Sequence, residues 1–370
     1  MTNNQYQTPQ GPPLGYIEHV SIPRLPFEFE SSILFAIHLP NLMNGNHILL
    51  GIVMLAATLC TLGWRYFTHR KAPVPAWGWS GLAIILLAEL LLFLRVRWVE
   101  VFFTPIVWTG YLLFADSLVC SLKGSSRIAN SLRSFLGLAC WSVPLWLVFE
   151  AYNLRLRNWT YVGLPQNPLL RGLGYTWSFA TIWPAIFETA DLISAMGWSR
   201  DRRETGYAFR PTRHITPFLL GLACLTLPLL APPRLGGYLF GAVWVGFILV
   251  LDPINYSWGG RSLLRDLEQG ETSRLNAYLC SGLVCGILWE FWNYWASAKW
   301  LYVFPMWQNW KVFEMPIPGF LGFPPFAVEC LVMYEFLLGL RGRVFGHECS
   351  LNEKNSTTES AGTDPFVGHR

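Results

Sequence analysis

The sequence predicts an all-α, polytopic membrane protein with about nine transmembrane helices. Of its 370 residues, 52% are hydrophobic and 16% aromatic, but only 14% are charged, whereas a soluble chain usually carries about 25% charged residues. Nine apolar windows approach the roughly 20 residues needed to cross a hydrocarbon core. They are 47–66, 78–96, 99–121, 134–153, 173–197, 216–231, 235–255, 274–296 and 318–340. The low charge and these windows together favour a bilayer over a large soluble core.

An internal repeat is the third observation behind this fold. Polar and aromatic residues of 77–200 recur in register in 216–343, at spacings of 136 to 141 residues. The matched pairs are Asp116 with Asp252, Glu150 with Glu290, Asn153 with Asn293, Trp159 with Trp300, Tyr161 with Tyr302, Pro184 with Pro325 and Glu188 with Glu329. The pattern predicts two parallel-repeat four-helix units, related by an axis along the membrane normal, plus one N-terminal helix.

The predicted organisation has six segments. They are an extracytoplasmic N-terminal segment (1–46), a first transmembrane helix with its link (47–76), repeat unit 1 (77–200), a basic cytoplasmic linker (201–215), repeat unit 2 (216–343) and a disordered cytoplasmic tail (344–370). Orientation follows from the lysines and arginines in the connections, which cytoplasmic loops favour. With this assignment one side carries 18 of them and the other nine. The sequence therefore predicts an integral membrane protein with its N-terminus outside and its C-terminus cytoplasmic.

Four glutamates are the candidate catalytic residues: Glu150, Glu188, Glu290 and Glu329. A charged side chain near the bilayer centre costs about 2.5–3.5 kcal/mol even on lenient scales, and no lysine or arginine lies deep enough in the spans to neutralise these acids. They must then be protonated, hydrogen-bonded to Asn, Trp or Tyr donors, wetted by a cavity, or bound to a cation. Buried, uncompensated carboxylic acids are plausible proton donors or relays. The alternative is that they form hydrogen bonds that hold the helices together.

A set of amides and aromatics accompanies these acids. The candidate substrate-binding residues are Asn153, Asn293, Trp159, Tyr161, Trp289, Trp300 and Tyr302. The E-x-x-N spacing puts the acid and the amide on one helix face, a turn apart, and the two units are expected to aim both sets at one cavity. An aromatic lining would hold an apolar polyene or stabilise a cation over its ring faces. Interfacial belts and lipid-facing bulk explain tryptophans equally well.

Several function classes find no support in the sequence. The net charge of +4 is modest and no basic block suggests nucleic acid. Eight cysteines lie mostly in apolar runs without zinc or disulfide spacing, so no metal site is predicted. No nucleotide-binding or hydrolase motif appears, and no cofactor is predicted. The expected partners are membrane lipids or a hydrophobic small molecule, and the oligomeric state is left open.

Two stretches carry a resemblance to known membrane enzymes. They are "PAIFETADL" (184–192) and "PFAVECLVMYEF" (325–336), in which a proline precedes a glutamate by four positions. With the two four-helix units, they resemble UbiA-type membrane prenyltransferases and integral-membrane carotenoid cyclases. The paired aspartate-rich motifs of the prenyltransferases and the adjacent acids of the cyclases are absent, so no catalytic residue is transferred. The resemblance implies an isoprenoid substrate.

The leading functional hypothesis is a pseudo-symmetric acidic and aromatic cavity inside the membrane. It would bind or convert a hydrophobic, isoprenoid-like substrate by carboxylic acid/base chemistry. Whether the chain is an enzyme stays open; if it is, a membrane isoprenoid or lipid cyclase, hydratase or transferase is expected. The alternatives are a proton- or cation-coupled transporter and a membrane scaffold.

Overall fold

Each of the nine apolar windows overlaps a long helix. The computed structural model describes residues 44–198 and 215–360. The nine helices are α2 (Asn44–His69), α3 (Ala76–Phe93), α4 (Arg97–Lys123), α5 (Arg127–Leu156), α6 (Pro168–Ala195), α7 (Ile215–Leu230), α9 (Phe240–Ser257), α11 (Ser273–Trp295) and α12 (Phe323–Ser360). The short α8 (Pro233–Gly236) and α10 (Leu263–Glu268) lie in the links. The described part is thus nearly all-α, as predicted, whereas almost all of 1–46 and 201–215 lies outside it.

The described helices have the composition of membrane spans. Seven stretches are long and apolar enough to cross a bilayer: α2 from His47, α3, α4, α5, α9, α11 and Ile317–Val344. Their outer faces carry large exposed apolar side chains such as Trp64, Trp79 and Leu86, which a water-soluble surface does not tolerate in such numbers. Of the other two predicted spans, α7 has only 16 residues, and α6 is largely buried from Phe179 to Ile193. These features indicate an integral membrane protein.

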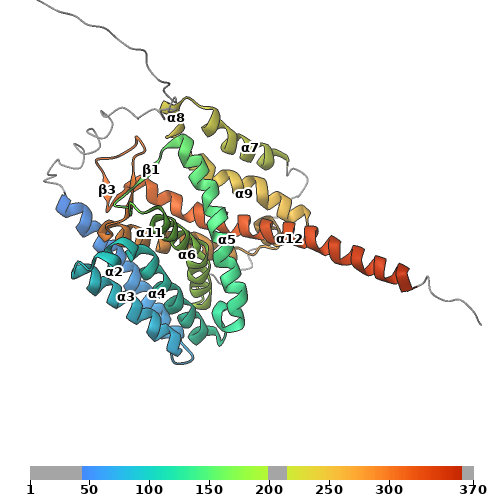
Figure 1. The fold of residues 1–370 in the computed structure, drawn as a ribbon, viewed down its shortest axis with the longest axis horizontal. Coiled ribbons are helices and arrows are strands. Elements are labelled where there is room, and N and C mark those ends of the chain that lie inside the picture. Colours follow the sequence, from blue (N-terminus) through green and yellow to red (C-terminus); the bar gives the residue numbers. More distant parts are fainter. Residues whose placement is uncertain (1–43, 199–214, 361–370) are drawn as a thin grey trace, which may run out of the picture. The chain divides into compact units, whose positions relative to one another are not determined.

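Helix pairs pack in the same order in the two halves of the chain. In the first half α3 packs on α4, α4 on α6 and α5 on α6; in the second, α7 packs on α9, α9 on α12 and α11 on α12. The α6–α11 contact joins the halves. Figure 1 shows the α3–α4 and α7–α9 pairs on opposite sides, with the remaining core helices between them. The α3–α4 contact depends on Gly81 and Gly110, where an added Cβ would lie 2.5 and 2.8 Å from the facing glycine oxygen.

Four short strands, which the sequence analysis did not predict, follow α5 and α11. Strand β1 (Trp159–Val162) pairs antiparallel with β2 (Lys299–Tyr302). Strand β3 (Lys311–Val312) pairs with β4 (Met315–Pro316). Strands β1 and β2 return to the ends of α5 and α11, where they are hydrogen-bonded by Asn153 and Asn293. The β1–β2 pair, called the ribbon below, brings together two segments that are far apart in sequence.

The last helix differs from its prediction at both ends. A 3₁₀ segment, η2 (Ile317–Gly322), precedes α12, so the window 318–340 is broken near its start, and Pro324 and Pro325 lie in the first turn of α12, where proline is tolerated. At the other end α12 continues to Ser360, past the boundary predicted at residue 343. The physical reason is that no proline occurs between Pro325 and Pro365 to stop the helix.

Candidate functional site

Two asparagines fold the chain back from helix to strand. Asn153, near the end of α5, donates its amide to Trp159 O (2.9 Å) and accepts from the backbone N–H of Asn158 and Trp159. Asn293, near the end of α11, donates to Trp300 O (2.9 Å) and accepts from Trp300 N–H (3.0 Å). The two asparagine side chains thereby supply hydrogen-bond partners to backbone N–H and C=O groups that would otherwise be buried without one. Both asparagines therefore position the strands.

Glu150 is hydrogen-bonded by three aromatic side chains. Its Oε1 accepts from Trp146 Nε1 (2.9 Å), Trp159 Nε1 (3.1 Å) and the Tyr161 hydroxyl (2.6 Å). Burial and the nearby carboxylate raise the pKa of the Tyr161 phenol well above its ordinary value. The phenol thus stays protonated and acts as a donor to the glutamate.

Glu290 has a similar environment on the other side of the ribbon. Its Oε1 accepts from the Tyr302 hydroxyl (2.9 Å), which in turn accepts from Trp300 Nε1 (2.9 Å). Burial and Glu290 also raise the pKa of the Tyr302 phenol well above its ordinary value. Glu290 is completely buried, and its Oε2 has no hydrogen-bond partner in the described part of the chain. Each strand therefore covers one glutamate with a tyrosine and a tryptophan.

A cavity of about 160 Å³ lies directly beside this ribbon. Fourteen of its 27 lining residues are aromatic. They are Phe102, Trp108, Trp146, Phe149, Trp159, Tyr161, Tyr175, Phe179, Trp244, Trp289, Trp300, Tyr302, Phe323 and Phe326. Such a lining suits an apolar ligand with a polarisable surface.

Two cationic side chains also line the cavity, Arg171 and Lys299. Arg171 is exposed near the start of α6. Lys299 donates to Glu314 Oε1 (2.6 Å), and its Nζ lies 5.2 Å from the centre of the Tyr294 ring. Among the described residues Arg171 forms no ion pair, so it is the freer of the two charges for a ligand's polar head.

The structure brings only some of the predicted site residues to the cavity. Trp159, Tyr161, Trp289, Trp300 and Tyr302 line it. The four glutamates and two asparagines do not line it; Glu150 and Glu290 lie behind the lining tyrosines that donate to them. A catalytic role for the four glutamates stays a prediction, and proton exchange between a cavity ligand and Glu150 or Glu290 would have to pass Tyr161 or Tyr302.

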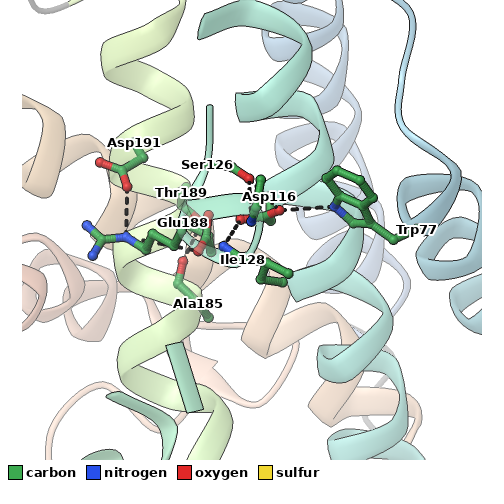
Figure 2. Close-up of polar contacts among 10 residues, drawn as sticks. Trp77, Asp116, Ser126, Ile128, Ala185, Glu188, Thr189 and Asp191 are labelled. Carbon is green, nitrogen blue, oxygen red and sulfur yellow. Dashed lines mark hydrogen bonds and ion pairs between the residues drawn. The ribbon is translucent and has the colours of Figure 1, made fainter. Parts of the chain in front are cut away.

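Glu188 lies in a separate polar cluster between α4, α5 and α6 (Figure 2). It is completely buried, and neither carboxyl oxygen has a hydrogen-bond partner among the described residues. Arg127 Nε lies 2.8 Å from Asp191 Oδ2 and 4.0 Å from Glu188 Oε1. The prediction that no cation reaches the acids is therefore wrong here, because the long arginine side chain extends from the first turn of α5.

In the same cluster, Asp116 on α4 is hydrogen-bonded to the starts of α3 and α5. Its Oδ1 accepts from Ile128 N–H (2.9 Å), and its Oδ2 accepts from Ser126 Oγ (2.8 Å) and Trp77 Nε1 (3.0 Å), as Figure 2 shows. Asp116 thus caps the start of α5, where a negative charge is favourable. Its counterpart Asp252 caps the start of α10 through two backbone N–H groups.

Glu329 is completely buried on α12. In the described residues neither of its carboxyl oxygens has a hydrogen-bond partner, and no ion pair to it is found. An unpaired buried carboxyl group of this kind is costly. Glu188 and Glu329 thus share burial and unpaired carboxyl oxygens, but only Glu188 has an arginine nearby.

Several cavity residues were missed from the sequence, above all Trp108, Trp146 and Tyr175. Trp146 could have been found, because it precedes Glu150 by one helical turn. Trp108 and Tyr175 gave no local signal, since they reach the cavity only through helix packing. Among the described residues, no group of three or more histidine, cysteine or acidic residues could hold a metal ion.

Comparisons with protein-family models, with curated protein sequences and with solved structures give no match for this chain. The cavity is therefore interpreted from its own geometry.

Proposed function

We propose that this membrane protein binds a hydrophobic, isoprenoid-like molecule in the aromatic cavity beside the β1–β2 ribbon. The observation that carries the proposal is the lining itself, in which aromatic residues predominate and which contains no aspartate, glutamate, histidine or cysteine. Unsaturated hydrocarbon chains pack favourably on aromatic ring faces. Arg171 and Lys299 leave room for a polar or anionic head at one part of the cavity.

We also infer that the two halves of the chain are copies of one four-helix unit. The pairing of strands β1 and β2 supports this, because Trp159 pairs with Tyr302 and Tyr161 pairs with Trp300. Exchanging every residue for its counterpart 141 positions away turns the first pair into the second. Two copies of one unit, related by a two-fold axis through the ribbon, would exchange the two pairs in this way. The matching contacts of Asn153 and Asn293 point the same way.

The orientation is part of the proposal. Lysines and arginines concentrate in the links that follow α2, α4, α6 and α9. Because cytoplasmic loops favour these residues, we place that end of the bundle in the cytoplasm and the β1–β2 ribbon outside. The cavity would then take its ligand from the outer half of the bilayer.

Filling the cavity is expected to abolish binding. Gly174 lines the cavity, and a Cβ added there would lie 3.5 Å from the Phe102 ring, which is ordinary contact. Gly174→Phe should therefore fold, place its ring in the cavity and lower farnesol affinity by at least about tenfold. The measurement is tryptophan fluorescence during farnesol titration of the protein in phosphatidylcholine nanodiscs.

Gly172 supplies the matched control on the same helix. It does not line the cavity, and an added Cβ meets nothing within 4 Å. Gly172→Phe should bind farnesol as the wild type does. Equal affinity of the Gly174→Phe variant and the wild type would show that this cavity is not the binding site.

The buried carboxyl groups favour proton-coupled transport as a second candidate function. Glu188 and Glu329 have no hydrogen-bond partner in the described structure, and unpaired acids inside a membrane bundle are typical of proton relays. In this case the ligand would move across the bilayer together with a proton.

Replacing both acids with glutamine tests this candidate. In liposomes holding the dye pyranine and an imposed pH gradient, farnesol should speed proton entry through the wild type. Glu188→Gln with Glu329→Gln should slow it by at least about tenfold, since an amide cannot carry the proton. Glu100→Gln is the control, because the one ion pair of Glu100 among the described residues is with the exposed Arg95 at 3.7 Å. No farnesol-dependent proton entry through the wild type would exclude transport.

A further inference from the structure

The face of α4 that borders the cavity carries two polar groups without hydrogen bonds. Trp108 is 1% exposed, and its indole N–H has no partner among the described residues. One turn earlier, the buried Thr104 hydroxyl also lacks a partner. Both residues line the cavity. An unmet buried donor costs about 1–3 kcal/mol, so a ligand or water in the cavity has a favourable place to bind.

The local sequence explains why this face is polar. Pro105 has no N–H to donate to the carbonyl oxygen of Val101, and Phe102 departs from helical geometry with φ −105° and ψ 17°. Val101, Thr104, Pro105 and Trp108 share one helix face by their spacing, and all four line the cavity. The irregular turn therefore presents its polar groups to the cavity side of α4.

Four polar groups on the ribbon side of the lining already have protein partners. The Tyr161 and Tyr302 hydroxyls donate to glutamates. The indole N–H groups of Trp159 and Trp300 donate to Glu150 and to the Tyr302 hydroxyl. Thr104 and Trp108 thus differ from the ribbon residues in having no protein acceptor.

We infer that the ligand is not a pure hydrocarbon but carries an oxygen atom that binds between Thr104 and Trp108. The indole can only donate, whereas the threonine hydroxyl can donate or accept. An alcohol can therefore accept from Trp108 and donate to Thr104, and a carbonyl oxygen can accept from both. This inference rests on the proposed function, because it names the polar group of the ligand of that same cavity.

The test compares ligands that differ only in oxygen. The probes are farnesol, its aldehyde and the hydrocarbon with the same carbon skeleton, titrated into the protein in phosphatidylcholine nanodiscs. The wild type should bind the two oxygenated probes about tenfold more tightly than the hydrocarbon, the effect of one or two buried hydrogen bonds. Thr104→Val and Trp108→Phe should each reduce that ratio toward one.

A second cavity threonine provides the matched control. Thr181 lines the cavity, but its hydroxyl already donates to Ser178 O (2.7 Å), so Thr181→Val should leave the ratio unchanged. Equal binding of hydrocarbon and alcohol by the wild type would mean that Thr104 and Trp108 bind only water, and would overturn this inference while leaving the proposed function intact. Failure of all three probes to bind would overturn both.

Discussion

Replacing Gly163 with alanine is expected to lower the apparent melting temperature by about 8 °C and to abolish ligand binding. Gly163 follows β1 and has a φ of +68°, a left-handed conformation that costs other residues roughly 1–2 kcal/mol. An added Cβ would also lie 2.0 Å from the Ser297 carbonyl oxygen, just before β2. To relieve this overlap, β1 and β2 must move apart, which lowers the free energy of unfolding by about a further 1–3 kcal/mol.

Gly124 separates the two contributions. It ends α4 with a φ of +78°, but its added Cβ meets nothing within 4 Å. Gly124→Ala should therefore cost only the conformational strain, about 3 °C in the same thermal scan in detergent, and should leave binding intact. Equal losses in the two variants would show that the close approach at Ser297 does not hold the ribbon in place.

The helices were predictable because their signal is local. Each apolar window is long enough to be recognised by itself, and every window overlaps a long helix. The ribbon was not predictable in this way: β1 and β2 have four residues each and pair across more than a hundred residues of chain. The aromatic and β-branched residues of "WTYV" suit a strand, but nothing in that stretch identifies its partner.

The site was predictable in its residue types and less so in its arrangement. The sequence shows that buried acids need partners, and the structure supplies them to Glu150 through Trp146 and the ribbon. The sequence does not show which side of a helix faces the cavity. Aromatic rings therefore line the cavity, while the carboxyl groups lie one layer behind or, like Glu188, in a separate cluster.

Removing the Asp116 carboxylate is expected to destabilise the first half of the chain strongly. Asp116→Ala leaves three donors without their acceptor: Trp77 Nε1, Ser126 Oγ and Ile128 N–H. Hydrogen bonds to a charged group contribute about 1.5–3 kcal/mol each, although the partly exposed donors can recover some of this from water or lipid headgroups. We expect a loss of about 3 kcal/mol, seen as a fall of about 6–10 °C in apparent melting temperature in detergent.

Asp252 allows the number of donors to be varied while the residue type is kept. It accepts from only two groups, Leu263 N–H and Leu264 N–H, at the start of the six-residue α10. Asp252→Ala should therefore cost less than Asp116→Ala, and Asp116→Asn should fall between Asp116→Ala and the wild type, since an amide oxygen still accepts. If Asp116→Ala melts within about 2 °C of the wild type, the carboxylate does not join α3, α4 and α5.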